Sequence, residues 1–152
     1  MKKILFATLL IVSLEASAQY GSGYKTGLGM QVDFGTGSTL VGFDAKHFFD
    51  QHNVGEAQLL FGTGVVVLGA QYEYHGDIQN AAGLKWYAGF GPQIAFVKDG
   101  GTDLLLRPLI GLDYKINDVP LNFSFDWRPA FQATHGTGFE AARFGLAFRY
   151  AF

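Results

Sequence analysis

The side chains best suited to catalysis in this chain are its histidines, which are His47, His52, His75 and His135. A histidine acts as a general base when a hydroxyl nucleophile lies within hydrogen-bond reach and an acid orients the ring. His135 has possible partners in Thr134, Thr137 and Glu140, but no serine lies close to it in sequence. A solvated loop histidine is the better interpretation, so we predict no enzymatic activity.

Metal and cofactor chemistry also lacks a recognisable motif. The spacing of His47, His52 and His75 matches no known ligand pattern, and the chain contains no cysteine. The Gly27-Leu28-Gly29 run is not followed by a helical segment, as a phosphate-binding loop requires. We therefore predict no bound metal and no cofactor.

Charged residues form the remaining constellation, because they recur at alternate positions of otherwise apolar segments. Eight are basic and six are acidic: Lys25, Asp33, Asp44, Lys46, Glu56, Glu73, Lys85, Arg107, Asp113, Lys115, Asp126, Arg128, Arg143 and Arg149. Ionised groups inside a narrow barrel must be paired or hydrated, because unpaired burial is costly. We predict a lumen filled by paired charges. A narrow water path with a mild preference for anions is the alternative.

The elements that would position these charges are eight segments with period-two alternation, separated by turn residues. They span residues 25–34, 40–49, 54–75 (divided near 62–64), 84–97, 104–116, 121–131 and 142–152. The division near 62–64 follows from a change of parity, because the polar positions are even before it and odd after it. Eight strands with short connections predict an antiparallel up-and-down barrel.

The last segment shows the alternation most clearly. Its even positions form an apolar, mostly aromatic face: Phe144, Leu146, Phe148, Tyr150 and Phe152. Its odd positions form a face of small or cationic residues: Arg143, Gly145, Ala147, Arg149 and Ala151. A soluble barrel would bury the aromatic face, whereas a membrane barrel would turn it towards lipid.

Three patterns favour the membrane arrangement. Basic residues lie on strand faces rather than in turns, and acids and glycines share that same face. Tyrosine and tryptophan gather towards the ends of the apolar face, as in the aromatic girdles of membrane barrels. These girdle candidates are Tyr72, Tyr74, Trp86, Tyr114, Trp127 and Tyr150.

The N-terminus reads as an export signal. Lys2 and Lys3 precede an apolar run over 4–14 and an Ala16-Ser17-Ala18 cleavage pattern. We predict a signal peptide over residues 1–18, cleaved near Ala18, and one barrel domain over 19–152. Counting charges without the signal gives 9 basic and 12 acidic residues, a net charge of about −3, and nothing in this balance suggests nucleic acid.

The chain resembles the small eight-stranded outer-membrane barrels of Gram-negative bacteria, the OmpA, OmpX and OmpW type, at the level of pattern over residues 20–152. Its specific motif is the C-terminal assembly signal of such barrels, matched by Arg143, Gly145, Phe148, Tyr150 and Phe152. The resemblance implies an outer-membrane location, with lipids and the barrel-insertion machinery as partners, and a monomer.

Two features depart from that family. The connections expected on the outer side are short, which weakens an adhesin or receptor function, because such functions reside in long loops. Pro92, Pro108 and Pro129 fall within strands, where each removes a ladder donor, so we expect bulges or strand ends there. The predicted role is structural or accessory in the envelope. The alternatives are a narrow pore for small solutes and a soluble lipocalin-like barrel that binds an apolar ligand.

Overall fold

The computed structural model describes residues 23–134 and 138–152, which form a single antiparallel β-sheet. The strands are β1 (Thr26–Gly35), β2 (Leu40–Phe48), β3 (Asn53–Gly62), β4 (Val65–Asp77), β5 (Leu84–Val97), β6 (Gly101–Lys115), β7 (Leu121–Trp127), β8 (Ala130–Gln132), β9 (Gly138–Glu140) and β10 (Arg143–Ala151). The expected signal peptide and His135 lie outside the described residues. Within those residues, no helix is long and apolar enough to cross a membrane.

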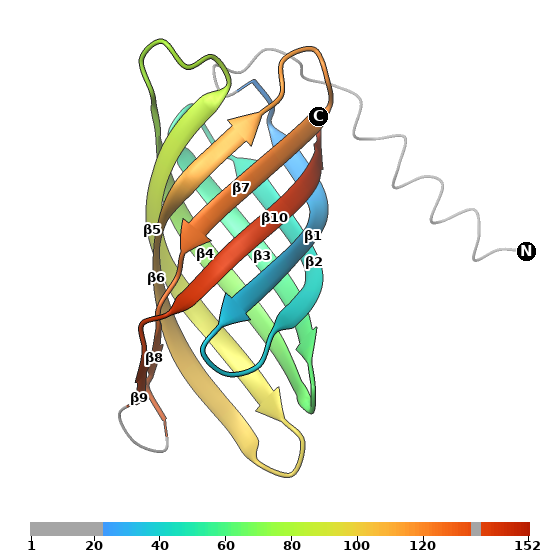
Figure 1. Cartoon of the computed structure of the whole chain (residues 1–152), viewed down its shortest axis with the longest axis vertical. Helices are drawn as coiled ribbons and strands as arrows, with labels where there is room; N and C mark the ends of the chain where they lie inside the picture. Colours follow the sequence, from blue (N-terminus) through green and yellow to red (C-terminus); the bar gives the residue numbers. More distant parts are fainter. Residues whose placement is uncertain (1–22, 135–137) are drawn as a thin grey trace, which may run out of the picture.

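The sheet closes on itself as a barrel (Figure 1). β10 pairs with β1 on one side, from Gly27 opposite Ala151 to Gly35 opposite Arg143, and with β7 on the other. β8 continues the line of β7, because both pair with β6 in one register. Likewise β9 continues the line of β10, because β8 pairs with β9 as β7 pairs with β10. The ten segments therefore form eight strands around the barrel, and the predicted eight-stranded antiparallel barrel is confirmed.

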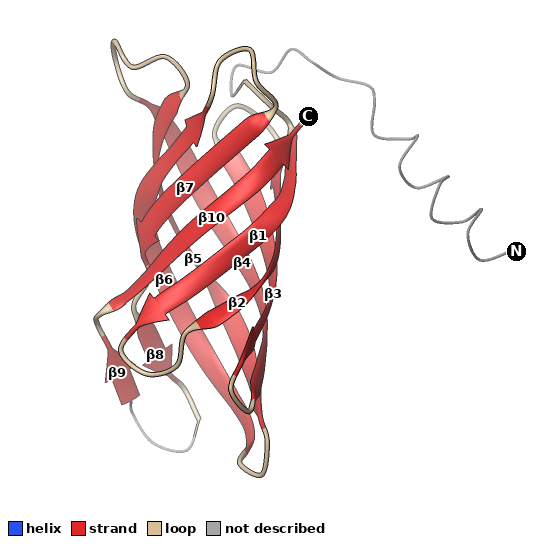
Figure 2. Ribbon diagram, turned by 45° about the vertical axis from the view of Figure 1, so that its right-hand side comes forward, coloured by secondary structure: helices blue, strands red, loops and turns tan. Residues whose placement is uncertain are grey.

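The two ends of the barrel carry different connections (Figure 2). The connections 49–52, 78–83 and 116–120 lie at the end where β1 begins and β10 finishes, which we call the terminus end. The tight turns 36–39, 63–64 and 98–100 lie at the opposite end, the hairpin end, together with the short strands β8 and β9. Gly64 has φ 70° in its turn, a left-handed conformation that favours glycine.

The two faces of the sheet are inverted relative to a soluble barrel. Large apolar side chains point outward; Phe43 is 62% exposed and Tyr150 is 54% exposed. On the inner face, Lys46 and Arg149 are fully buried. In β10 every second residue is buried, and the residues between them are exposed or, at Phe144, half-buried, so its aromatic residues lie on the outer side.

Pro92 and Pro108 are accommodated without a bulge, contrary to expectation. The β5–β6 ladder runs unbroken past both residues, with Pro92 opposite Leu106 and Pro108 opposite Phe90. The backbone N–H groups that these prolines lack are missed on the other sides of β5 and β6, in the ladders to β4 and to β7 and β8. The β4–β5 ladder has no pairs at Ala70 and Gln71, which lie beside Pro92.

Pro129 lies at a strand end, as expected, in the two-residue gap between β7 and β8. Continuing the β6 register places it directly opposite Pro108, so neither side of this part of the ladder can donate a hydrogen bond. The neighbouring strands β9 and β10 carry one extra residue at this point, because Trp127 pairs with Phe144 whereas Ala130 pairs with Glu140. Residues 141–143 thus oppose 128–129 in a β-bulge.

Inside the barrel, two apolar clusters lie towards its two ends. Tyr24, Phe48, Val54 and Ala151 form the cluster at the terminus end. Leu40, Leu60, Val67 and Ala95 form the cluster near the hairpin end. The inner surface between them carries the charged side chains.

Candidate functional site: the charged lumen

The described residues bury equal numbers of opposite charges inside the barrel. Six basic and six acidic side chains are buried: Lys46, Lys85, Arg107, Arg128, Arg143 and Arg149, with Asp33, Asp44, Glu56, Glu73, Asp113 and Asp126. Lys25 and Lys115, also expected in the lumen, are only half-buried. The expected excess of eight bases over six acids is therefore absent from the buried set, and with it the reason to expect a preference for anions.

Lys46 on β2 lies at the centre of the network. Its ammonium nitrogen is 2.8 Å from Glu73 and 3.1 Å from Glu56, and a third carboxylate, Asp113, is 3.6 Å away. The same nitrogen lies 4.3 Å from the centre of the Tyr87 ring, a cation–π distance. One cation on β2 thus connects acids from β3, β4 and β6.

Arg149 on β10 forms the second hub. Its guanidinium donates to Asp44, to Glu56 at 2.9 Å, to Asn122 Oδ1 at 3.0 Å and to Ser124 Oγ at 2.8 Å. The planar fork of arginine suits such multiple contacts, which a lysine could not reproduce. Through Glu56, this hub joins the one around Lys46.

Arg128, just after β7, forms a close ion pair with Asp126 near the end of that strand. The Arg128 guanidinium donates to both oxygens of Asp126. The Tyr87 hydroxyl also donates to Asp126, at 2.6 Å. Gly145 gives this pair its space: a Cβ there would lie 2.4 Å from Arg128 Nε and 2.7 Å from Asp126 Oδ1. The glycine of the expected assembly motif therefore also has a packing role.

Asp33 on β1 is held between two arginines towards the hairpin end. Arg107 NH2 donates to it at 2.9 Å and Arg143 NH2 at 2.6 Å. Arg143 NH1 also donates to the carbonyl oxygens of Thr36, at 2.5 Å, and Ser38, at 2.9 Å, which fastens the β1–β2 turn to β10.

Arg107 also compensates for the prolines. Its Nε donates to the carbonyl oxygens of Arg128 at 3.0 Å and Pro129 at 3.1 Å, and its NH2 reaches Arg128 O at 2.6 Å. These carbonyls lie where the ladder to β6 is interrupted. A side chain from the lumen thus replaces backbone donors that Pro108 cannot supply.

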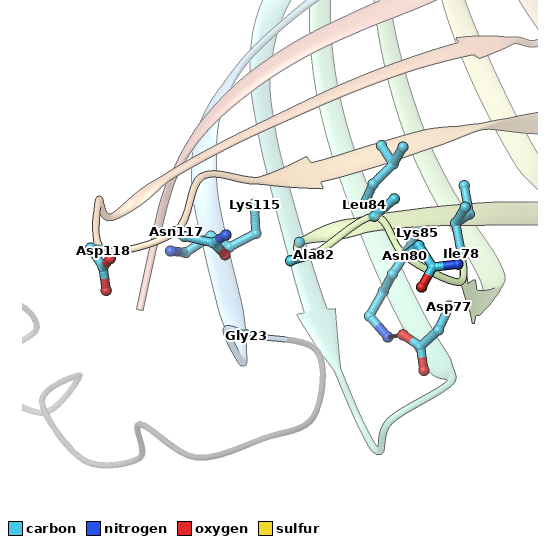
Figure 3. A pocket seen from close by; sticks show the side chains of 12 residues that line it. Gly23, Asp77, Ile78, Asn80, Ala82, Leu84, Lys85, Lys115, Asn117 and Asp118 are labelled. Carbon is cyan, nitrogen blue, oxygen red and sulfur yellow. Dashed lines mark hydrogen bonds and ion pairs between the residues drawn. The ribbon is translucent and has the colours of Figure 1, made fainter.

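The remaining lysines lie at the terminus end. Lys85 donates to Asp77, which is exposed. Lys115 donates to the carbonyl oxygens of Ile116 at 2.9 Å and Val119 at 2.7 Å in the β6–β7 turn. Both lysines line an open cavity of about 930 Å³ between that turn and the 78–83 connection (Figure 3).

The three described histidines do not assemble into a catalytic or metal site. His47 Nδ1 lies 2.9 Å from Thr26 Oγ1, and His52 Nδ1 bonds the His75 carbonyl at 2.8 Å. His75 Nε2 lies 2.7 Å from Glu73 Oε2, and its ring stacks on Tyr87 at 4.8 Å. In the parts of the chain that the structure describes, no three potential ligands group together as a metal ion would require.

Selection by charge alone missed the neutral members of the network. Gln93 accepts from Arg107 at 2.8 Å and donates to Gln58 at 2.8 Å, and Asn122 donates to Asp113 at 2.7 Å. The strand parity that places charges on the inner face also places these amides there, so that signal was present in the sequence. Tyr24 donates to Asp113 at 3.2 Å but precedes the first expected strand.

Comparison with known proteins shows similarity at the level of fold. Neither family profiles nor curated sequences match the chain. Among solved structures, the crystal structure of Neisserial surface protein A (NspA) aligns with a TM-score of 0.53 and 16% sequence identity, over 84% of this chain and 95% of that one. The chain therefore shares the barrel fold of NspA.

Proposed function

We propose that this chain is an integral outer-membrane barrel with a structural or accessory role in the envelope and no enzymatic activity. The observation that carries the proposal is the radial separation of side chains. Aromatic and aliphatic residues cover the outside, whereas twelve charged side chains are buried in the lumen. In water, such a surface would be an aggregation hazard, but in lipid it is the stable arrangement.

The orientation follows from the termini, because the lengths of the connections depart from the usual pattern. Outer-membrane barrels place short turns on the periplasmic side and longer loops outside, but here the longest connection, 78–83, lies at the terminus end. A mature chain that enters after signal cleavage would leave its termini in the periplasm. The hairpin end then faces outward, and its short turns offer little surface for a receptor or adhesin function.

We propose further that the lumen does not conduct. The largest fully buried side chains, among them Arg107, Arg128 and Arg149, fill the middle of the barrel. An eight-stranded barrel is only wide enough for its interior to be filled by side chains. The balance of six buried bases and six buried acids favours a self-neutralising core over an ion path.

Two measurements test this function. The chain should fractionate with outer membranes, and an unboiled sample should migrate differently from a boiled one on a denaturing gel. Recovery of folded protein from the soluble fraction without detergent would contradict the membrane assignment. In planar bilayers the pure protein should give no steady openings, and such openings would instead support the narrow-pore alternative.

A further inference from the structure

A layer of four aromatic rings closes the lumen at the terminus end. The ring centres of Tyr24 and Phe48 are 5.0 Å apart, and those of Phe48 and His75 are 4.9 Å apart. His75 in turn stacks on Tyr87, with the ring centres 4.8 Å apart. All four residues are buried. We call this set the aromatic layer.

Two hydroxyl groups fasten the aromatic layer across the lumen. Tyr24, just before β1, donates to the carboxylate of Asp113 on β6 at 3.2 Å. Tyr87 on β5 donates to Asp126 on β7 at 2.6 Å. Because β1 and β6 are not neighbours in the sheet, the first of these bonds reaches across the barrel. The charge network begins directly behind the layer, since Lys46 Nζ lies 4.3 Å from the centre of the Tyr87 ring.

The change from exposed to buried polar side chains coincides with this layer. On β6, Lys115 is half-buried and lines the open cavity of about 930 Å³, whereas Asp113, two positions further into the barrel, is 1% exposed (Figure 3). On β4, Asp77 lines the same cavity and is exposed, whereas His75 is fully buried. Solvent in the cavity therefore meets the aromatic layer before it meets the buried charges.

Tyr24 differs from the other three rings because it lies outside the strands, just before β1. Lys25 and Thr26 both donate their backbone N–H groups to the carbonyl oxygen of Phe152, at 3.0 and 2.8 Å. Two residues thus oppose one, which is a β-bulge, and bulges re-aim the side chains beside them. Odd positions of β1, such as Asp33, face the lumen, so unbroken alternation would turn Tyr24 outward. The bulge turns it inward instead.

We infer that Tyr24 is a lid that separates the charged lumen from the cavity at the terminus end. Its ring packs edge-on against Phe48, and its hydroxyl bond to Asp113 holds it across the opening. Because Asp113 lies 3.6 Å from Lys46, displacement of this one side chain would connect the cavity to the centre of the network. Water and small ions would enter from the terminus end and stop there, because large buried side chains fill the middle of the barrel.

Cysteine labelling tests this inference, because the chain contains no native cysteine. Ser124 is buried and lies opposite Asp113 in the β6–β7 ladder, so Ser124→Cys places a thiol just behind the lid. The micelle-folded variant is exposed to a small cationic methanethiosulfonate, and mass spectrometry follows the reaction. We expect slow labelling with Tyr24 in place and labelling faster by about tenfold or more after Tyr24→Ala, because the rate reports the population of open molecules.

Three control variants make the result specific. Ser38→Cys, in the exposed β1–β2 turn, should label rapidly and shows that the reagent is active. Tyr114→Ala removes an exposed tyrosine from the outer face of β6 and should leave labelling of Ser124→Cys slow. Leu60→Cys, fully buried in the cluster near the hairpin end, should stay slow after Tyr24→Ala. Equal acceleration at positions 60 and 124 would indicate general loosening and overturn the inference.

Tyr24→Phe keeps the ring and removes the bond to Asp113. It should label Ser124→Cys faster than the parent but more slowly than Tyr24→Ala, and it supplies the test if the alanine variant does not fold. The inference rests on the proposed closed lumen, but the two fail differently. Fast labelling with Tyr24 in place would contradict both, whereas slow labelling in every Tyr24 variant would contradict the lid alone.

Discussion

Arg149 contacts two buried carboxylates, Asp44 and Glu56, and two neutral acceptors, Asn122 and Ser124. Replacing it by methionine removes the cation paired with Asp44, whereas Glu56 keeps Lys46 at 3.1 Å. We expect Arg149→Met to lower the free energy of unfolding by about 3–5 kcal/mol, the usual cost of removing one partner of a buried ion pair. Urea titration of the micelle-folded protein, followed by tryptophan fluorescence, measures this change.

The matched controls use charges in other environments. Lys98→Met removes a cation from an exposed turn and should change stability by less than about 0.5 kcal/mol. Adding Asp44→Asn to Arg149→Met should recover part of the loss, since one uncompensated carboxylate is then neutralised. A loss as small for Arg149→Met as for Lys98→Met would show that the network does not stabilise the barrel.

Asp50 organises the β2–β3 turn, outside the barrel wall. Its carboxylate accepts from the Asn53 side chain and from the backbone amides of His52 and Asn53, and these bonds hold its pKa below 3.8. Because the folded pKa is the lower one, its contribution is present above the unfolded pKa and is lost as pH falls through the folded value. We expect exchange of the His52 and Asn53 amides to be protected at pH 5 and to lose this protection as the pH falls below the ordinary pKa of an aspartate, relative to the trend of other turn amides. Asp50→Asn should remove this dependence.

At the scale of elements, the junction between β6 and the β7–β8 line depends on a side chain. Arg107 donates to the carbonyls of Arg128 and Pro129, where Pro108 leaves the ladder without a donor. We expect Arg107→Met to speed amide exchange in β8 and the adjoining part of β6 by at least tenfold, because about 1.4 kcal/mol of local stability corresponds to that factor. Amides of β2 should change less, and equal acceleration in both places would indicate global destabilisation instead.

The closing strand β10 is the element on which we expect assembly to depend. Phe148 and Tyr150 lie on its exposed face, and Phe152 forms backbone hydrogen bonds with Thr26, the first residue of β1, and with Lys25 before it. Deleting Phe152, or replacing Tyr150 with aspartate, should reduce the folded protein in the outer membrane severalfold, as measured by heat-dependent gel migration. Tyr114→Asp is the control, since it places a charge on the same outer surface of β6, away from the C-terminus. Normal accumulation of the Phe152 deletion would contradict the assembly-signal hypothesis.

For the whole molecule, strand parity made the architecture predictable but not the contacts within it. Alternation determines which face a side chain occupies, and Arg149 and Phe148 lie on opposite faces for that reason. Pairing in the lumen depends on how distant strands meet: Arg149 and Glu56 are 93 residues apart. The bulge at 141–143 and the carbonyls bonded by Arg107 lie beside the facing prolines Pro108 and Pro129, which no local pattern brings together because one lies in β6 and the other between β7 and β8.

The location of the charges also predicts how the whole barrel responds to salt. Ion pairs exposed to solvent are screened within about 3 Å at 1 M salt, whereas buried pairs are screened much less. Most lumenal pairs have both side chains almost fully buried, as Lys46 and Glu73 do. We therefore expect the free energy of unfolding in uncharged micelles to change by less than about 1 kcal/mol between about 0.05 and 1 M sodium chloride. A larger loss at high salt would mean that bulk water and ions reach the network, which is the behaviour of an open pore.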